Sequence, residues 1–191
     1  MTQTGRFLSL EGGEGAGKST QARALAAALS ARGIAAIVTR EPGGSEGAEA
    51  IRALLMEGAA NRWSAHSEAL LFAAARADHV EKVIRPAVGA GQWVICDRFV
   101  DSTRAYQGAA GGVDDAAILA LHGFGSGGLL PDRTYLLALP PEEGAARAAA
   151  RDGGTDRFAT AEADRYRRID ATQPPEAVTQ AILGDLASWL P

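Results

Sequence analysis

Residues 12–19 read Gly-Gly-Glu-Gly-Ala-Gly-Lys-Ser and follow directly on the apolar run Phe7-Leu8-Ser9-Leu10. The spacing matches the pattern G-x-x-x-x-G-K-[ST], placed where a strand passes into a helix. Glycines in such a turn adopt positive φ, so successive N–H groups point at phosphate oxygens, and the helix N-terminus adds its positive end. The stretch therefore predicts a phosphate-binding loop, in which Lys18 reaches the β- and γ-phosphates and the Ser19 hydroxyl holds Mg²⁺.

Two other interpretations of this stretch fit less well. A glycine-rich turn without a ligand would not require strand, loop, Lys-Ser pair and helix to occur together. A dinucleotide fingerprint that uses Gly13 and Gly15 requires a third glycine at position 18, where the chain has Lys18.

The composition limits the class of protein and its partners. The 191 residues, 47% hydrophobic and 22% charged, suit one globular domain over residues 1–191. The net charge of −4 argues against a nucleic-acid polymer as partner and leaves small phosphorylated ligands. Cys96 is the only cysteine, so no internal disulfide forms. With no signal segment and no apolar stretch of about 18 residues, we expect a cytoplasmic protein that does not bind membranes.

Short apolar runs alternate with longer helical patterns along the chain. The runs predict strands at 7–11, 36–40, 93–97, 133–139 and 166–170. Ala-rich patterns predict helices at 19–32, 48–56, 67–88, 114–122, 142–151 and 174–189. Gly and Pro clusters predict loops at 42–44, 108–112, 123–131 and 152–154. The alternation indicates an α/β fold with a parallel sheet, helices on both faces, and ligand loops at the carboxyl ends of the strands.

A carboxylate and a cation follow each other where the run from Trp93 ends. Asp97 stands where phosphate-loop enzymes place an acid beside Mg²⁺, although an Asp here could also cap the next turn. Arg98 follows at once. Such a pair suits two phosphates bridged by a metal ion.

Phe72 and Arg76 lie four residues apart in a predicted helix, and therefore on one face of it. A planar base could stack on the ring and accept hydrogen bonds from the guanidinium. The alternative is a core Phe with a surface Arg. Leu55 and Met56 are interpreted as core residues.

Three arginines, Arg147, Arg151 and Arg157, bracket a Gly-Gly segment after the fourth predicted strand. Arginines on a mobile loop can close over a transferring phosphoryl group and neutralise its charge. The alternative for Arg147 and Arg151 is a solvated helix face. The three histidines, His66, His79 and His122, have no metal-ligand spacing and are expected to be structural or exposed.

Over nearly the whole chain, the sequence resembles thymidylate kinases of the bacterial type. The segments that carry the resemblance are Glu11-Gly-Gly-Glu-Gly-Ala-Gly-Lys-Ser-Thr20, Thr39-Arg-Glu-Pro-Gly-Gly44, Leu71-Phe-Ala-Ala-Ala-Arg76, Asp97-Arg98 with Ser102-Thr103 and Tyr106-Gln-Gly108, and Ile169-Asp-Ala-Thr172. The resemblance implies a three-layer P-loop NTPase fold, with a five-stranded parallel sheet flanked by helices and a mobile lid at about residues 147–165. It further implies in-line transfer of the ATP γ-phosphoryl to dTMP for dTTP synthesis, with Mg²⁺ as cofactor, by a homodimer.

The resemblance also implies a role for each site residue. Phe72 stacks on thymine, Arg76 and Thr103 hydrogen-bond its edge, and Tyr106 stands where a ribose 2′-hydroxyl would lie. The remaining residues expected at dTMP are Glu11, Arg40, Arg98, Ser102 and Gln107. Those expected at ATP are Gly12, Gly13, Glu14, Gly15, Ala16, Gly17, Lys18, Ser19, Thr20, Arg147 and Thr172. The expected catalytic group is Lys18, Asp97, Arg98, Arg151 and Arg157, with the metal on Ser19 and Asp97.

The phosphate loop also indicates the subtype. Family members with an arginine inside this loop lack a catalytic one in the lid, whereas here Gly15 follows Glu14, so Arg151 and Arg157 are expected to act in catalysis and Arg147 to lie against adenine. The chain departs from the family in having only seven residues between Phe158 and Tyr166, where the family has a further helix.

Two rival functions remain open from the residues alone: a kinase for another nucleoside monophosphate, and a nucleotide-driven switch or ATPase. The predicted base pocket argues against the switch. Asn61 is the only asparagine, so the chain has no N-K-x-D element for guanine, which argues against a signalling GTPase.

Overall fold

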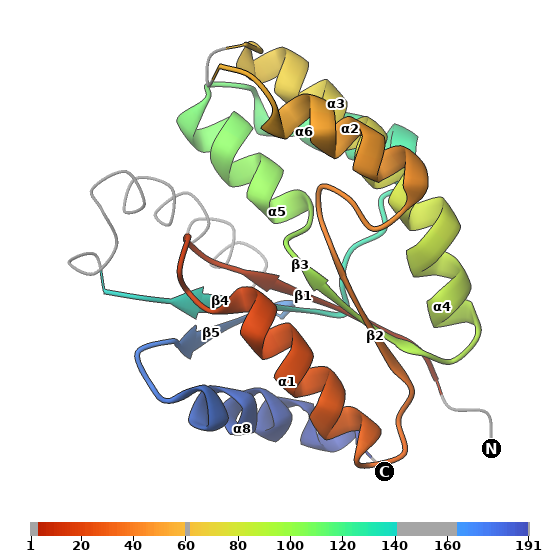
Figure 1. Cartoon of the computed structure of the whole chain (residues 1–191), viewed down its shortest axis with the longest axis vertical. Helices are drawn as coiled ribbons and strands as arrows, with labels where there is room; N and C mark the ends of the chain where they lie inside the picture. Colours follow the sequence, from red (N-terminus) through yellow and green to blue (C-terminus); the bar gives the residue numbers. More distant parts are fainter. Residues whose placement is uncertain (1–3, 60–61, 141–163, 191) are drawn as a thin grey trace.

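Five parallel strands form one sheet in the order β2–β3–β1–β4–β5 (Figure 1). The computed structural model describes residues 4–59, 62–140 and 164–190. The strands are β1 (Arg6–Glu11), β2 (Ala36–Arg40), β3 (Trp93–Asp97), β4 (Arg133–Ala138) and β5 (Tyr166–Asp170). At the centre, Leu8 of β1 pairs in register with Ile95 of β3 and with Arg133 of β4. The five predicted strands are thus confirmed, with β1 starting one residue earlier and β4 ending one residue sooner than expected.

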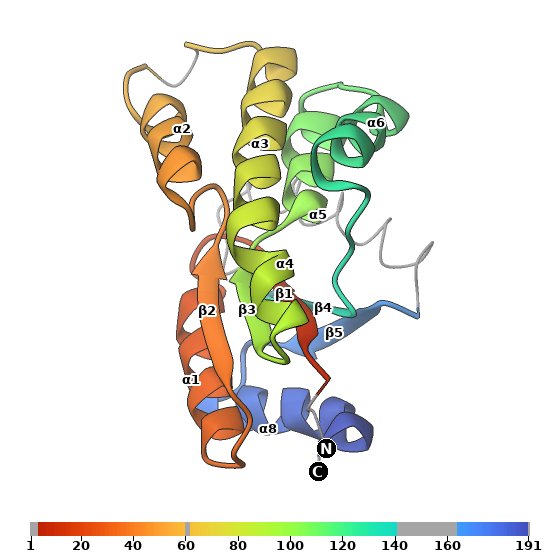
Figure 2. The ribbon, with the colours of Figure 1, turned by 90° about the vertical axis from the view of Figure 1, so that its right-hand side faces the viewer.

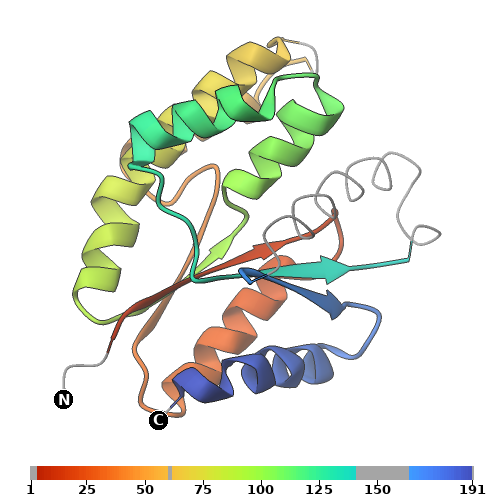
Figure 3. The ribbon, with the colours of Figure 1, turned by 180° about the vertical axis from the view of Figure 1, so that it is seen from behind.

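Helices cover both faces of the sheet, as Figures 1 and 3 show from opposite sides. On one face lie α1 (Lys18–Ser30) and α8 (Pro175–Asp185), which the 3₁₀ turn η3 (Leu186–Trp189) extends. The helices α2 (Glu46–Met56), α3 (Ala65–His79) and α6 (Asp115–Ser126) lie together beyond the other face (Figure 2). None of the helices in the described part of the chain is both long and apolar enough to cross a membrane.

The alternation of strand side chains divides the core into two layers. Leu8 and Leu10 of β1 pack with α1 and α8, whereas Phe7 packs on the opposite face with Val94 and Cys96 of β3. Because both faces are covered, these strands are buried and their sequences read as continuous apolar runs.

The helix predicted over residues 67–88 is present as one helical stretch that changes its winding. It consists of α3, a π-helical segment η1 (Val80–Ile84) and α4 (Arg85–Gly89). Ser64 caps its start, since the Ser64 hydroxyl accepts a hydrogen bond from the Ser67 N–H at 3.2 Å. The helix predicted at 142–151 lies outside the described residues.

Two predicted loops are partly helical, so these predictions were wrong. Residues 100–110 form α5 (Val100–Thr103) and the π-helical η2 (Arg104–Ala110), and α6 runs to Ser126 through two glycines. The glycines serve helix packing: a Cβ at Gly125 would lie 3.2 Å from the Ala77 Cβ on α3, and one at Gly108 would lie 3.1 Å from Ile118. A glycine pattern that suggested a break instead marks close contact between helices.

Candidate functional site

The loop between β1 and α1 has the backbone that phosphate binding requires. Gly12, Gly15 and Gly17 have φ of 136°, 80° and 80°. A Cβ at Gly12 would lie 2.5 Å from the Leu137 carbonyl oxygen, so this glycine is required for space as well as for its dihedral. Lys18, 8% exposed, donates from Nζ to the carbonyl oxygens of Gly12 and Gly13 at 2.9 and 2.7 Å. The ammonium is thereby held over the loop.

A hydroxyl and a carboxylate meet beside this loop. Ser19 of α1 donates from Oγ to Oδ2 of Asp97, the last residue of β3, at 2.5 Å. Oxygens of this kind are the ligands that Mg²⁺ prefers, and the ion usually completes its shell with substrate phosphates and water. No cluster of three or more His, Cys, Asp or Glu side chains that could hold a metal occurs in the described residues. The donor set therefore fits a nucleotide-bound Mg²⁺ rather than a metal enclosed by protein.

Arg98 adopts φ of 71°, the only positive φ at a non-glycine position in the described ranges. Its N–H donates to the Leu10 carbonyl at 2.9 Å, and its guanidinium lies 5.2 Å from the centre of the Tyr106 ring. Nη1 of Arg98 donates to Ser102 Oγ at 3.0 Å. This unusual backbone turns the arginine away from β3 toward α5 and η2, and a strained position of this kind is typical of functional sites.

Glu11 stabilises the same turn through two hydrogen bonds. Its side chain is 1% exposed, and its two carboxylate oxygens accept hydrogen bonds from the Phe99 N–H at 2.8 Å and the Ser102 hydroxyl at 2.6 Å. Burial, together with the negative charge of Asp101, raises the pKa of Glu11 to about 7. Glu11 therefore fixes the segment that carries Arg98.

A cavity of about 360 Å³ opens beside this turn. Its lining comes from the phosphate loop, the β2–α2 connection and the helical segments α2, α3, α5 and η2. The lining residues are Glu14, Glu41, Pro42, Arg52, Met56, Phe72, Arg76, Arg98, Phe99, Ser102, Thr103, Tyr106 and Gln107. The cavity thus combines three aromatic rings with several cations and hydroxyls, the set that a flat heterocycle carrying a phosphate requires.

Arg76 is buried at one end of the cavity. It is 2% exposed, donates from Nε to Glu41 Oε2 at 2.7 Å and from Nη2 to Thr103 Oγ1 at 2.8 Å, and lies 5.3 Å from the centre of the Phe99 ring. Phe72, one turn earlier on α3, lines the same cavity. The alternative of a core Phe with a surface Arg is therefore wrong, because the Arg is buried and the Phe faces the cavity.

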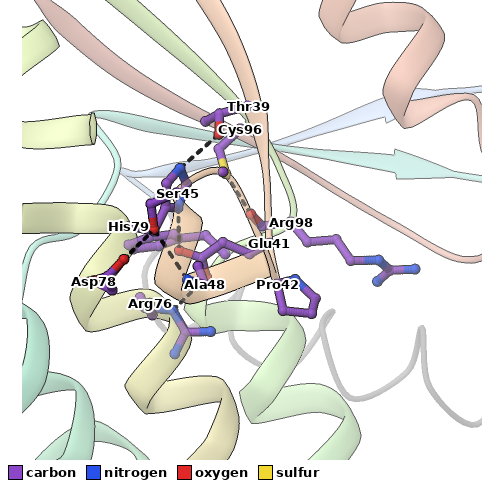
Figure 4. Close-up of polar contacts among 12 residues, drawn as sticks. Thr39, Glu41, Pro42, Ser45, Ala48, Arg76, Asp78, His79, Cys96 and Arg98 are labelled. Atoms are coloured by element: carbon purple, nitrogen blue, oxygen red, sulfur yellow. Dashed lines mark hydrogen bonds and ion pairs between the residues drawn. The ribbon is translucent and has the colours of Figure 1, made fainter. Parts of the chain in front are cut away.

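Glu41 and His79 join this wall without having been assigned a role from the sequence (Figure 4). His79 is fully buried, with Nδ1 3.1 Å from Glu41 Oε1 and Nε2 2.7 Å from Thr39 Oγ1. The position of Glu41 between Arg40 and a proline, at the carboxyl end of a predicted strand, was the available signal. For His79 no sequence signal existed beyond its own identity.

Several residues have surroundings that the sequence did not indicate, and the ligand roles expected for Glu14 and Arg40 stay predictions. Glu14, expected at ATP, lines the cavity with Phe72. Arg40, expected at the dTMP phosphate, pairs with Glu49 at 3.1 Å and lines a second hollow together with Ser19 and Asp97. Met56 was expected in the core and is 56% exposed at the end of α2, where it reaches the cavity. That prediction was wrong because α2 ends there, beyond the part of the helix that covers α3.

The other residues expected to bind nucleotide lie in separate parts of the structure. Gln107 donates to Glu68 at 2.9 Å while lining the cavity, and Thr20 is an exposed residue of the first turn of α1. Thr172 follows β5 and donates from its hydroxyl to Asp170 at 2.6 Å. The three arginines expected in the lid, Arg147, Arg151 and Arg157, lie outside the described residues.

A buried ion pair behind the cavity was missed by the sequence analysis. Asp101 of α5 is fully buried and accepts hydrogen bonds from Arg165 at 2.7 and 3.0 Å and from Arg104 at 3.3 Å. Although burial opposes ionisation, the hydrogen bonds and charge of Arg165, together with Arg104, hold the pKa of Asp101 below its ordinary value. The pair fastens α5 to the residue that precedes β5.

Comparisons with known proteins agree on one family. A sequence model described as Thymidylate kinase matches residues 10–182. A thymidylate kinase of Rhizorhabdus wittichii is 56% identical over 206 residues, covering 98% of this chain and 99% of that protein. A thymidylate kinase of Caulobacter vibrioides is 54% identical over 200 residues, covering 95% of each. The crystal structure of thymidylate kinase from Ehrlichia chaffeensis superposes with a TM-score of 0.83 at 33% identity, covering 95% of this chain and 98% of that one.

Proposed function

The chain belongs to the thymidylate kinase family and phosphorylates dTMP to dTDP with ATP, and from this premise we propose how its residues divide the work. The 360 Å³ cavity takes dTMP, with thymine against Phe72 and Arg76 and the phosphate toward Arg98. ATP binds at residues 12–20, with its β- and γ-phosphates at Lys18. The observation that carries this assignment is that one turn, Asp97 to Ser102, joins the lysine side of the site to the cavity.

The acceptor needs no strong general base, because a monophosphate is already ionised at neutral pH. Catalysis then depends on alignment of the two phosphates and on neutralisation of the charge between them. Lys18 and Arg98 supply positive charge, and both are held by hydrogen bonds before substrate arrives. Such preorganisation removes the cost of reorienting these groups during the reaction.

We propose Mg²⁺ as the cofactor, held by Ser19 and Asp97 together with phosphate oxygens. The support is the hydroxyl and carboxylate pair at 2.5 Å beside the phosphate loop. When bound, the ion neutralises charge on the β- and γ-phosphates.

Three further features extend the proposal from the sequence. Arg151 and Arg157 act on the transferring phosphoryl group, Arg147 lies against adenine, and the enzyme works in the cytoplasm as a homodimer. The homodimer is proposed from the resemblance to the thymidylate kinase family.

The proposal is tested with a coupled assay for ADP release in the presence of each nucleoside monophosphate. dTMP is expected to give the highest kcat/KM, and replacement of Phe72 by Ala is expected to raise the KM for dTMP while the KM for ATP changes little. ADP release that does not depend on any monophosphate would contradict the assignment of the cavity. A matched control is Phe124→Ala, which lies outside the cavity lining.

A further inference from the structure

Behind Arg76, a row of hydrogen-bonded side chains lines the buried side of the cavity. Apart from Arg76, its members have no role in the proposed reaction. It runs from Thr39 on β2 through His79 on α3 to Glu41 after β2, and ends at the Arg76 guanidinium (Figure 4). His79, Glu41 and Arg76 have side-chain exposures of 0%, 4% and 2%. Among these three buried side chains, each polar group must therefore find its partner within the protein.

The side chains around His79 determine which hydrogen bonds its two ring nitrogens make. The Glu41 carboxylate and the Arg76 guanidinium already balance each other at 2.7 Å. In this set Nδ1–H donates to Glu41 Oε1, because a carboxylate oxygen only accepts, and Nε2 can accept from the Thr39 hydroxyl. Each carboxylate oxygen of Glu41 then has its own donor, one from His79 and one from Arg76.

This arrangement leaves one edge of the Arg76 guanidinium for the cavity. Nε is held by Glu41 and Nη2 by Thr103, whereas within residues 4–59, 62–140 and 164–190 Nη1 makes no hydrogen bond. A fixed guanidinium edge prefers a carbonyl acceptor and opposes an amino donor. Thymine and cytosine differ in this respect, since thymine presents the carbonyl O4 where cytosine presents the amino group N4.

We propose that His79 is a positioning residue for base selection: it orients Glu41, and Glu41 holds Arg76 so that Nη1 faces the thymine carbonyl. The inference rests on the proposed function of the cavity. The β2–α2 connection is packed on His79 in a manner that supports it, because a Cβ at Gly44 would lie 2.4 Å from both His79 Nε2 and Thr39 Oγ1. The same connection is tied to α3 next to His79, where Ser45 donates to Asp78 at 2.6 Å.

Two substitutions at His79 separate its two nitrogens. In His79→Asn the amide nitrogen takes the place of Nδ1 and keeps the donor to Glu41, whereas in His79→Gln the amide takes the place of Nε2 and the Glu41 contact is lost. Since a hydrogen bond to a charged group is involved, we expect His79→Gln to raise the KM for dTMP about tenfold and to lower the ratio of kcat/KM for dTMP over dCMP by a similar factor. His79→Asn is expected to keep both values within about threefold of the wild type.

Controls separate positioning from loss of a buried ring. His122 is also buried but bonds to the Leu129 carbonyl at 2.7 Å, so His122→Gln makes the same substitution without touching Glu41 and should leave the dTMP to dCMP ratio unchanged. Thr39→Val removes the hydroxyl donor to Nε2 and is expected to raise the KM for dTMP about threefold. Melting temperature and the KM for ATP are measured for each variant.

Equal effects of the Asn and Gln variants on the dTMP to dCMP ratio would overturn the positioning role. If His79→Asn does not fold, an unchanged ratio in folded His79→Gln and Thr39→Val would overturn it as well. A wild-type enzyme whose ADP release does not depend on dTMP would instead refute the function of the cavity, so the two failures are distinguishable.

Discussion

Replacement of Glu11 by Gln should make the free energy of unfolding less dependent on pH. From acid to alkaline pH, the wild type is expected to lose stability that the variant keeps. Glu11 is buried, and its two oxygens accept from the Phe99 N–H and the Ser102 hydroxyl. The Gln amide has the shape of the protonated acid: its oxygen accepts from Phe99, and its NH₂ group donates to Ser102 Oγ. The variant therefore removes the ionisation and keeps the packing.

The magnitude follows from the pKa of this carboxyl, which burial and the charge of Asp101 raise from 4.5 to about 7 in the folded protein. Between these values the folded wild type binds a proton that the unfolded chain has released, so the free energy of unfolding falls as the pH rises. A shift of this size corresponds to about 3 kcal/mol in total, of which about 2.5 kcal/mol is lost between pH 5 and pH 8. Above about pH 8 no further loss from Glu11 is expected.

Urea unfolding of wild type and Glu11→Gln at a series of pH values measures this term directly. We expect the wild type to lose about 2.5 kcal/mol relative to the variant between pH 5 and pH 8, which is a melting-temperature difference of about 5 to 10 °C for a chain of this size. Glu49→Gln is the matched control. A hydrogen bond from the Gly44 N–H and the charge of Arg40 lower the pKa of Glu49, so its contribution is lost as the pH falls and has the opposite sign.

A constant difference between wild type and Glu11→Gln from pH 5 to pH 8 would refute the reasoning. It would mean that Glu11 stays ionised when folded, so that the donors from Phe99 and Ser102 and the nearby Arg98 outweigh burial and Asp101. If the wild type instead lost stability relative to the variant as the pH falls, the pKa of Glu11 would be lowered by folding rather than raised.

Four other substitutions test the roles assigned to the site residues. Lys18→Met is expected to lower kcat by a factor of about a hundred or more with an unchanged melting temperature, and near-normal turnover of the folded variant would remove Lys18 from the mechanism. Arg151→Ala or Arg157→Ala should lower kcat far more than it raises the KM for dTMP, and a change in KM alone would make these arginines binding residues. Tyr106→Ala should narrow the preference of dTMP and dUMP over UMP, measured as kcat/KM, and a wild type that accepts UMP as well as dUMP would exclude a role for Tyr106 at the sugar.

The sheet and most helices could be predicted because their signals are local. The run from Trp93 to Asp97 is buried on both faces, so its sequence is continuously apolar and its ends are sharp. The segment from Val100 to Ala110 gave no comparable signal, because its helical winding includes a π-helical part and its glycine packs against Ile118. The distinction between a glycine that breaks a helix and one that allows a close contact depends on the neighbouring helix, which the local sequence does not contain.

The site residues likewise fall into those that local spacing could predict and those that depend on tertiary packing. Lys18 and Ser19 belong to one local motif, and Phe72 with Arg76 to one helical face, so spacing alone could group them. The contact of His79 with Glu41 joins residues 38 positions apart, and it depends on how the β2–α2 connection packs on α3. The pairing of Arg40 with Glu49 was likewise not indicated by the sequence, and the expected role of Arg40 at the dTMP phosphate stays a prediction.

The segment that follows β3 connects both ends of the site. Asp97 meets Ser19, Arg98 turns toward the cavity at positive φ, and Thr103 holds Arg76 on the far side. Glu11 fixes the middle of the segment through Ser102, while α5 is fastened behind by the Asp101 pair with Arg165.

Because these contacts lie within seven consecutive residues, the distance between the oxygens proposed to bind Mg²⁺ and the guanidinium proposed to contact the base is set by one short stretch of chain rather than by two independent loops. An insertion within it would therefore displace the phosphate acceptor from the donor even if every side chain of the site were retained. In-line transfer depends steeply on this alignment, and the fully buried Asp101, paired with Arg165, holds the segment in place behind the site.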